Sequence, residues 1–435
     1  MANIKPFRAW RYREEKAGKA ETLFSPLLDV VDTEQLAELY QKEYNSIHLS
    51  VPRSHESVVR KLKEWKYENI IKQEALPSIY VYYQTFQLPT ENQSYTRKGF
   101  VSMIEMCEND ILLHEDTITH SVESRIHLLE QTMLNIIPTH GLYEDTQFQL
   151  EKIMDEYMQT PLYQYEDVHG IVTKLAIIQN PKDILAFIRV LKNKQIYLAD
   201  GHHRLESSRI FRDKYLMENG LADSSFINYH LMYLTNLAAD DLRILPTHRI
   251  WQPKENISLA DVLSRMFPYW KVTDVSDYPQ PLSMLMQNKK YAFGLIHKRK
   301  EYLIEIRLGL QTNIPLEMPE VWKQLSYTVL HYYFFEKAAY IPYHQQSQSE
   351  ELRYEKSYST AAEAGRDGAF TFICQEVTMQ EIVEVCQSGC KMPQKSTYFY
   401  PKVVCGLLFG SIKDEENNSA FDSWFTVAEK KAIAR

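Results

Sequence analysis

The segment Ile196-Tyr-Leu-Ala-Asp-Gly-His-His-Arg-Leu-Glu-Ser-Ser-Arg209 changes its hydrophobic pattern at the dipeptide Asp200-Gly201. The four residues before this dipeptide form an apolar run that is typical of a buried strand, and Asp-Gly is itself a turn signal. Apolar and small residues then recur at helical spacing as far as the stop signal Asn219-Gly220, and these are Leu205, Ser208, Phe211 and Tyr215. The sequence therefore predicts a strand, a tight turn and a helix that begins near His202 or His203.

The predicted turn has the chemistry of an anion site. The first amides of a helix have no partner of their own and carry the positive end of the helix dipole. Arg204 adds a guanidinium that matches phosphate oxygens, and Gly201 lets a ligand approach the backbone closely. Asp200 is placed to hold a metal, to orient a histidine or to accept a proton. The alternative is a plain turn in which Asp200 caps the helix and the histidines are exposed.

Length and composition describe an ordinary globular chain. The 435 residues suffice for two domains, and contents of 44% hydrophobic and 24% charged residues are usual for such proteins. A net charge of −8 argues against a general nucleic-acid binder, although it is compatible with a local basic patch. Five cysteines argue against a disulfide framework and favour a reducing compartment. Because the sequence shows neither a membrane-spanning segment nor a signal-peptide core, we expect a cytoplasmic location.

Strand and helix patterns are both present along the chain, so we predict a mixed α+β fold. The clearest strand runs from Ile79 to Gln87, with Gly99 to Glu105 as its expected partner, and the alternating segment Asn45 to Ser50 is also predicted to be a strand. Sequence composition marks no linker. We place a first domain at 1–252, a second α+β domain at 253–410 and a loosely attached tail at 411–435.

A second group of candidate residues follows a short apolar run. His114 and Glu115 are adjacent and lack the His-Glu-x-x-His spacing of a metalloprotease helix. Glu115, on a loop beside His114 and Thr117, is a candidate general base or magnesium ligand, or else a solvated loop acid. Arg125 lies near the start of the next predicted helix.

Further candidates are scattered along the chain. His248 and Arg249 form a basic pair that either approaches a bound anion or lies on a surface turn. The segment that leads to Lys395 and Ser396 has the length of a phosphate-binding P-loop, but Gln394 replaces its second glycine. Lys395, Ser396 and Thr397, with Lys402 after an aromatic run, can still present cations and hydroxyls, although a structural turn into a core strand is the preferred explanation. Arg8 belongs to a basic and aromatic segment near the N-terminus.

Six short motifs of the chain together resemble a bacterial and archaeal family called domain of unknown function 1015. The motifs occur in the family's order and spacing over about residues 5–410, and they are Lys5-Pro-Phe-Arg-Ala, Asp29-Val-Val, His114-Glu-x-Thr117, Ala199-Asp-Gly-His-His-Arg204, Leu245-Pro-Thr-His-Arg249 and Met392-Pro-Gln-Lys-Ser-Thr-Tyr-Phe-Tyr-Pro-Lys402. The family usually has Pro-Pro-Tyr-Asp where this chain has Pro26-Leu-Leu-Asp29, so a role for a tyrosine there is in doubt.

The Asp-Gly-His-His-Arg motif is in turn similar to the phosphate-binding signature of the ParB and sulfiredoxin superfamily, one branch of which comprises kinases of free serine. This resemblance implies a ParB-like and sulfiredoxin-like N-terminal portion with a mixed sheet and helices. It also implies that Gly201, His202, His203 and Arg204 hold phosphate, with Asp200 beside the transferred group. The family's association with serine biosynthesis implies loss of phosphate from O-phosphoserine.

Physical reasoning and resemblance agree on phosphoryl transfer, which needs donors, cations and a carboxylate around the moving group. We predict dephosphorylation of O-phosphoserine, with transfer to water or to ADP. The expected catalytic residues are Glu115, Asp200, His202 and His203, and the expected phosphate-binding or nucleotide-binding residues are Gly201, Arg204, His114, Arg125, His248, Arg249, Arg8, Lys395, Ser396 and Thr397. Magnesium is an expected cofactor, ADP or ATP are compatible cofactors, and no sequence motif identifies a metal-ligand set.

A homodimer is compatible with the sequence, and two other interpretations of the function stay open. The first is a free-serine kinase that runs the reverse reaction at the same site. The second is a ParB-like, non-enzymatic regulator that binds nucleotide or DNA, for which the acidic sequence offers no basic helix-turn-helix. A sulfiredoxin-type redox enzyme would need a cysteine where His202 or His203 stands.

Overall fold

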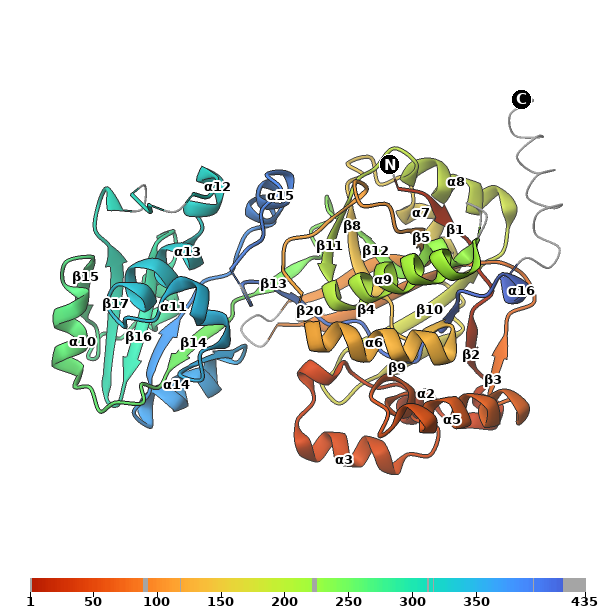
Figure 1. The fold of residues 1–435 in the computed structure, drawn as a ribbon, viewed down its shortest axis with the longest axis horizontal. Helices are drawn as coiled ribbons and strands as arrows, with labels where there is room; N and C mark the ends of the chain where they lie inside the picture. Colours follow the sequence, from red (N-terminus) through yellow and green to blue (C-terminus); the bar gives the residue numbers. More distant parts are fainter. Residues whose placement is uncertain are drawn as a thin grey trace. The chain divides into compact units, whose positions relative to one another are not determined.

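The computed structural model describes residues 2–88, 93–117, 119–220, 225–310, 313–315, 317–393 and 395–417. The chain forms two compact units, which we call unit 1 and unit 2. Unit 1 comprises the described residues of Met1–Leu113, Thr117–Leu242 and Pro401–Arg435, and unit 2 comprises those of His114–Asp116 and Arg243–Tyr400. Helices and strands are interspersed in both (Figure 1), which confirms the predicted α+β class.

Unit 1 is built on a mixed sheet to which nine strands contribute within the described residues, in the order β6-β11-β8-β12-β5-β4-β10-β9, with β1 paired to β5. Parallel pairs join β11 to β6 and β12 to β8, and the other pairs are antiparallel. The sheet strands are β1 (Ile4–Lys5), β4 (Ile79–Gln87), β5 (Ser94–Glu105), β6 (Ile111–Leu112), β8 (Thr139–Tyr143), β9 (Tyr163–Glu166), β10 (Val172–Ile178), β11 (Ile196–Asp200) and β12 (Tyr229–Asn236).

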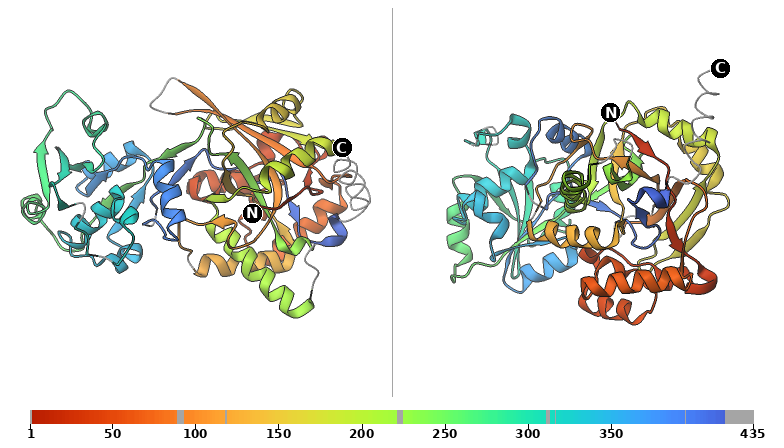
Figure 2. Two further views of the ribbon diagram at one scale, coloured as in Figure 1. Left: turned by 90° about the horizontal axis from the view of Figure 1, so that it is seen from above. Right: turned by 45° about the vertical axis from the view of Figure 1, so that its right-hand side comes forward.

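Helices and short strands complete unit 1 around this sheet. The helices are α1 (Glu14–Ala17), α2 (Ala20–Leu23), η1 (Leu28–Val30), α3 (Thr33–Gln41), α4 (Ile47–Ser50), α5 (His55–Tyr67), α6 (Thr119–Thr132), α7 (Glu151–Tyr157), α8 (Pro181–Leu191), α9 (His202–Asn219), η2 (Phe226–Asn228) and α16 (Asp414–Asn417). The short strands are β2 (Trp10–Tyr12), β3 (Ile71–Gln73), β7 (Leu134–Asn135) and β21 (Gly410–Ser411). Helices α6 and α9 pack side by side (Figures 1 and 2).

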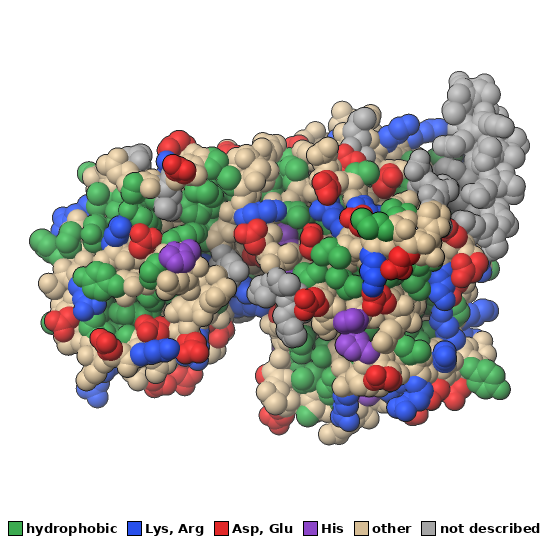
Figure 3. Space-filling view, viewed as in Figure 1, with side chains coloured by type: hydrophobic (Ala, Val, Ile, Leu, Met, Phe, Trp, Pro, Cys, Tyr) green, Lys and Arg blue, Asp and Glu red, His purple; other side chains and the backbone are tan. Residues whose placement is uncertain are grey.

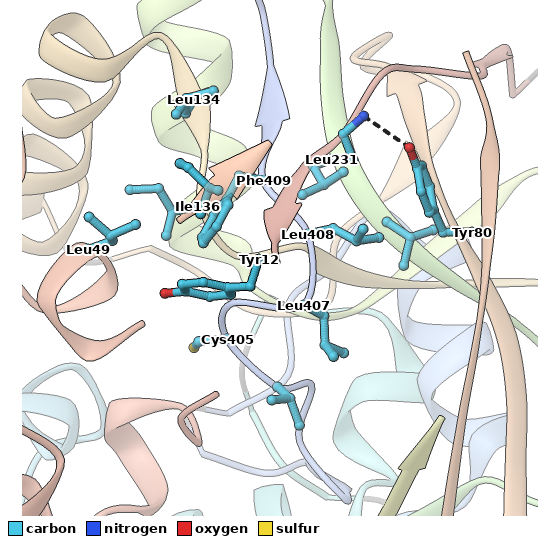
Figure 4. Close-up of a cluster of buried hydrophobic side chains, with 14 of the residues drawn as sticks. Tyr12, Leu49, Tyr80, Leu134, Ile136, Leu231, Cys405, Leu407, Leu408 and Phe409 are labelled. Atoms are coloured by element: carbon cyan, nitrogen blue, oxygen red, sulfur yellow. Dashed lines mark hydrogen bonds between the residues drawn. The ribbon is translucent and has the colours of Figure 1, made fainter. Parts of the chain in front are cut away.

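Two hydrophobic cores hold unit 1 together, and they contain alternate residues of the same strands. One core contains Tyr12 and Leu231 together with Phe409 and other residues of segment 403–412 (Figure 4). The other core contains Phe100, Phe187 and Leu205. Burial of such apolar side chains is the main favourable contribution to folding. The late segment is therefore an integral part of unit 1.

The strand, turn and helix predicted around Asp200-Gly201 are confirmed. β11 is buried from Ile196 to Ala199, and α9 begins at His202 with Gly201 as its N-cap. α9 ends at Asn219, and Gly220 in the left-handed region (φ 56°) closes it. β4 also has the predicted bounds, and β5 extends beyond its predicted start to Ser94.

Unit 2 has an antiparallel sheet of six strands within the described residues, in the order β15-β17-β16-β19-β14-β18, and a separate ribbon of β13 and β20. Its strands are β13 (Arg243–Leu245), β14 (His248–Trp251), β15 (Trp270–Asp274), β16 (Ala292–His297), β17 (Lys300–Ile306), β18 (Leu352–Glu355), β19 (Phe370–Ile373) and β20 (Tyr398–Tyr400). Its helices are α10 (Leu259–Met266), α11 (Leu282–Met286), α12 (Glu320–Lys323), α13 (Ser326–Leu330), η4 (His331–Glu336), η5 (Tyr343–Gln348), α14 (Tyr358–Arg366) and α15 (Met379–Gln387).

The predicted strand at Asn45 to Ser50 is wrong, because its last four residues form the helix α4 and the first two precede it. The carbonyl oxygen of the Asn45 side chain accepts the Ile47 amide at 2.9 Å, and this local bond starts a helical turn. The buried Ile47 and Leu49 still face the core. Polar and apolar alternation over six residues was too short a signal to separate a strand from a helical turn.

The limits of the two units differ from the domain limits at 252 and 410. β14 pairs with β18 and β19, so its residues belong to the sheet of unit 2. The chain returns to unit 1 at Pro401. Residues 411–417 are part of unit 1 as well, since Ser411 pairs with Leu134 and Asn417 donates to the Ser411 carbonyl at 2.9 Å. Residues 418–435 of the predicted tail lie outside the described residues.

Candidate functional site

Two cations hold the carboxylate of Asp200 at the end of β11. The Lys402 ammonium donates to Oδ1, and Nη2 of Arg204 donates to Oδ2 at 2.5 Å. Nη1 of Arg204 also donates to the Pro138 carbonyl at 2.5 Å. The three charged side chains keep between 10% and 17% of their surface exposed, so this Asp200 cluster lies at the edge of the core, within reach of solvent.

The two ion pairs decide the protonation state of Asp200. Burial of the carboxyl acts to raise its pKa, but the charges of Lys402 and Arg204 outweigh burial and hold the pKa well below its ordinary range. Asp200 is therefore a carboxylate at every physiological pH and a weak proton acceptor. The interpretation of Asp200 as a helix cap is wrong, because Gly201 is the N-cap of α9 and no side chain caps it.

Glycine at position 201 is required by both conformation and space. Its φ of 96° lies in the left-handed region. A Cβ atom at this position would stand 2.6 Å from Cγ2 of Thr139 and 2.9 Å from Nη2 of Arg204. The amides of Arg204 and Leu205 both donate to the Gly201 carbonyl, at 2.9 and 3.0 Å. An anion at this turn would therefore bind the side chains of Arg204 and Lys402 and not these two amides.

A buried histidine lies opposite Asp200 on the neighbouring strand. His140 pairs with Asp200 across β8 and β11, shares a 2.8 Å hydrogen bond between its Nε2 and Oγ1 of Thr235, and stacks on the Tyr233 ring at 5.1 Å. Burial and the charge of Arg97 lower the pKa of His140 well below its ordinary value. His140 is therefore a neutral imidazole, and it adds no charge to the site.

A third cation stands on β5, where Arg97 is fully buried. Its Nη2 donates to Oε1 of Gln84 and, at 2.6 Å, to the Pro401 carbonyl. The Gln84 amide in turn donates to the Lys402 carbonyl at 3.0 Å. The three cations Arg97, Arg204 and Lys402 therefore act on the same part of unit 1 as Asp200, and such a group of cations favours an anionic ligand.

The other predicted residues of unit 1 have different surroundings. His202 is buried at the first position of α9, and the half-buried His203 accepts the Ser207 hydroxyl at its carbonyl. The pKa of Arg125, on α6, is lowered by loss of water and by the charge of Arg204, and the charge of Asp200 opposes this shift. Arg125 is therefore close enough to interact electrostatically with the Asp200 cluster. Nε of Arg8 instead donates to the Glu74 carbonyl at 2.8 Å.

In unit 2 the structure brings two predicted motifs together. Nε2 of His114 and Oγ1 of Thr397 share a hydrogen bond of 2.9 Å, and the Met392 amide donates to the His114 carbonyl at 2.7 Å. The half-buried Glu115 follows His114 directly, and Lys395 is exposed. The hydroxyl of the buried Ser396 donates to the Pro393 carbonyl at 2.6 Å, so Ser396 supports the local turn.

His248 and Arg249 lie in the interior of unit 2, so the interpretation as a surface turn is wrong. Nδ1 of His248 accepts the Cys374 amide at 3.1 Å, and burial together with the charge of Arg249 lowers its pKa to about 4. Nε of Arg249 donates to His331 at 3.1 Å, and its guanidinium lies 4.1 Å from the centre of the Tyr327 ring. These contacts indicate a structural role for both residues.

The sequence did not point to Arg97 or His140, and it offered Lys402 only as a cation that follows the Lys395 segment, outside the expected phosphate-binding residues. For Arg97 a signal was present, since alternation along β5 places it on the same face as the buried Val101 and Met103. A charge on a core face is a recognised indication of function. Lys402 closes the last sequence motif, but nothing local in the sequence connects it to Asp200.

Over the part of the chain that the structure describes, no three or more His, Cys, Asp or Glu side chains gather in a way that would hold a metal ion. Both oxygens of Asp200 are already bound by cations. The described residues therefore do not fit a magnesium site built by the protein alone. All five cysteines are free thiols. Among the described helices, none combines the length and the apolar character needed to cross a membrane.

Comparisons with known proteins place the chain as follows. The model of the family DUF1015, described as a protein of unknown function, matches residues 4–328. No curated protein matches the sequence. Solved structures that are similar include a free serine kinase in complex with AMP (14% identity, TM-score 0.38, 73% of this chain and 92% of that chain) and a mutant free serine kinase in complex with ADP (14%, 0.38, 76% and 98%). SbnI with a C-terminal truncation, from Staphylococcus aureus, is 12% identical (TM-score 0.38, 76% and 96%).

Proposed function

The chain belongs to the DUF1015 family, and we propose that it is a phosphoryl-transfer enzyme of serine metabolism that releases serine from O-phosphoserine, with water or ADP as the acceptor. ADP enters this proposal through the resemblance of the Asp-Gly-His-His-Arg motif to a phosphate-binding signature. A free-serine kinase would use the same site in the opposite direction, so direction is a question for the assay.

The main support for the proposal is that Arg204 and Lys402 both form ion pairs with Asp200 next to the N-terminus of α9. A phosphate monoester carries a charge of about −1.5 to −2 at pH 7, so it needs more than one cation. Catalysis of phosphoryl transfer consists mainly of positioning and of electrostatic stabilisation. Two partly desolvated cations of fixed geometry, next to the positive end of a helix dipole, provide both.

The residues of the Asp200 cluster have separate roles in this proposal. Arg204 and Lys402 bind the oxygens of the phosphoryl group. Asp200 keeps the two cations in place and, because its pKa is so low, is a poor general base. Gly201 leaves room for the guanidinium of Arg204. The roles that the sequence suggests for Glu115, His114 and Thr397, which belong to unit 2, stay predictions and enter no step of the proposed reaction.

The reaction breaks the bond between phosphorus and the serine oxygen and forms a bond from phosphorus to the oxygen of water or to a terminal phosphate oxygen of ADP. The serine oxygen gains a proton, and the products are serine with inorganic phosphate or with ATP. Since the described residues do not fit a magnesium site made by the protein alone, no step of this scheme passes through a metal.

The test is incubation of the purified chain with O-phosphoserine, with and without ADP, while serine, phosphate and ATP are measured. Serine is expected with phosphate if water is the acceptor, and with ATP if ADP is. Arg204→Ala should lose on the order of 10²-fold in rate, because it removes a charged donor to the phosphoryl group. The control Arg212→Ala changes an arginine of the same helix that pairs with Asp213, and it should keep the parent rate. A parent protein that releases no serine, or an Arg204→Ala variant as active as the parent, contradicts the proposal.

A further inference from the structure

Arg97 is an unusual residue for the interior of a domain. Its side chain is fully buried, and within the part of the chain that the structure describes its Nε and Nη1 groups have no hydrogen-bond partner. Its Nη2 donates to Oε1 of Gln84 and to the Pro401 carbonyl, and both acceptors are neutral. Among the described residues, Arg97 forms no ion pair. A buried guanidinium with unsatisfied donors is costly, and such groups are normally paired with an anion.

The surroundings of Arg97 connect it to the Asp200 cluster. Gln84 accepts from Arg97 and donates to the carbonyl of Lys402, whose ammonium binds Asp200. Pro401, which Arg97 also binds, is the residue before Lys402. The charges of Arg97, Asp200, Lys402 and Arg204 all contribute to the pKa shift of His140, so the four side chains surround one place in unit 1. Arg97 is thus a second cationic position beside the cation pair that we assign to phosphate.

We propose that Arg97 binds the carboxylate of the amino-acid substrate whose phosphate lies against Arg204 and Lys402. This inference rests on the proposed function. A phosphorylated amino acid has two anionic groups, and the second requires a cation of its own. A guanidinium suits a carboxylate in geometry and charge, and the neighbouring His140 cannot replace it because this histidine is neutral. The enzyme would then prefer phosphorylated substrates that also carry a carboxylate, as O-phosphoserine does.

The strongest competing explanation is structural support of the core. The Arg97 guanidinium lies 5.5 Å from the centre of the Tyr233 ring. Burial raises the pKa of Asp241, and the charge of Arg97 opposes that shift. If these contacts were the reason for Arg97, its loss would destabilise unit 1. If a ligand is the reason, replacing the unpaired buried charge by an apolar side chain of similar length should leave the stability unchanged or higher.

The experiment compares two substrates in the parent and in three variants. O-phosphoserine and O-phosphoethanolamine share phosphate, ammonium and chain length, but only the first has a carboxylate. Arg97→Met should lower kcat/KM for O-phosphoserine about 100-fold, the upper end for a hydrogen bond to a charged group, and should leave kcat/KM for O-phosphoethanolamine within about threefold. Arg209→Met is the matched control, since Arg209 is also buried and also has an unpartnered Nε, and it should leave the ratio of the two substrates unchanged. Arg97→Lys, which keeps the charge, should lie between parent and Arg97→Met.

The inference is overturned if both substrates lose equally, if neither loses, or if the Arg97→Met protein unfolds.

A measurement that needs no turnover tests the carboxylate subsite separately from the proposed function. The melting temperature of the parent should rise more with O-phosphoserine than with O-phosphoethanolamine, and that of Arg97→Met should rise equally with both. If the parent shows this difference but releases no serine, the carboxylate subsite stands and the proposed reaction falls. If the parent releases serine and Arg97→Met does so equally, the reaction stands and the subsite falls. If no ligand stabilises the parent and none is turned over, both fall.

Discussion

Replacing Asp200 by asparagine removes one negative charge and keeps the shape of the side chain. In the parent, this carboxylate stands between Lys402 and Arg204, and all three side chains are at most 17% exposed. The substitution would leave two cations close together, with a neutral amide between them. The perturbation therefore acts on the charge that holds the proposed phosphate-binding cations in place.

The magnitude follows from burial. Removing one partner of a buried ion pair costs about 3–5 kcal/mol, because the remaining charge is left without compensation. For a domain of roughly 250 residues, 1 kcal/mol corresponds to about 2–4 °C, so Asp200→Asn should melt roughly 10 °C below the parent. Asp155→Asn is the control in the same unit. Asp155 binds Lys98 at 2.7 Å, but its side chain is 48% exposed, so the loss should stay within about 1 kcal/mol.

The assay is thermal unfolding of both variants with and without inorganic phosphate. Once Asp200 no longer occupies the two cations, an added anion should take its place. Phosphate at about 100 times its dissociation constant should return about 2.7 kcal/mol to Asp200→Asn, and a smaller amount to the parent and to Asp155→Asn. The reasoning fails if Asp200→Asn is as stable as the parent, or if phosphate raises the melting temperature of all three proteins alike.

Three further predictions concern single residues. Gly201→Ala should lower the free energy of unfolding by about 1–3 kcal/mol more than Gly220→Ala does. Both glycines have a positive φ, but of the two only Gly201 would bring an added Cβ within 3 Å of Thr139 and Arg204. Chemical denaturation of the two variants measures the difference. Lys402→Met should weaken phosphate binding about tenfold in a calorimetric titration, and unchanged affinity would remove Lys402 from the site. The pKa of His248 is lowered to about 4 in the folded chain. Between about pH 6.5 and 4 the unfolded chain therefore binds a proton at this histidine and the folded chain does not. The free energy of unfolding should fall by about 3 kcal/mol as the pH drops from 6.5 to 4. His248→Gln, which can still accept the Cys374 amide, should reduce this slope; an unchanged slope would contradict the assignment.

Local sequence signals predicted the parts of the fold that depend on neighbours in the chain. The helix that starts at His202 follows from an apolar run, a turn dipeptide and helical spacing, and the structure has it there. The same kind of reasoning failed at Asn45 to Ser50, where one side-chain hydrogen bond outweighed the alternation.

Contacts between distant segments could not be predicted in this way. Lys402 binds Asp200 across 202 residues of sequence, and the chain must return from unit 2 to unit 1 before the two can meet. Arg249 shows the opposite case, since a basic pair in the sequence suggested a ligand or a surface turn, whereas the folded chain packs its guanidinium on Tyr327 inside unit 2. Charge in a sequence indicates neither depth nor partner, and both follow from the tertiary fold.

A surface of mixed charge binds anions weakly in many places. Figure 3 shows Lys, Arg, Asp and Glu side chains interspersed over the face that it draws. A test of the site must therefore locate the bound anion as well as detect binding.

The most direct measurement is a crystal structure of the protein with bound tungstate, a phosphate mimic whose metal atom is located by its anomalous scattering. We expect one strong peak in contact with the guanidinium of Arg204 and the ammonium of Lys402, and its loss in Arg204→Ala. A parent crystal whose peaks all lie away from these two side chains, or a peak there that persists in Arg204→Ala, would contradict the assignment of phosphate to the head of α9.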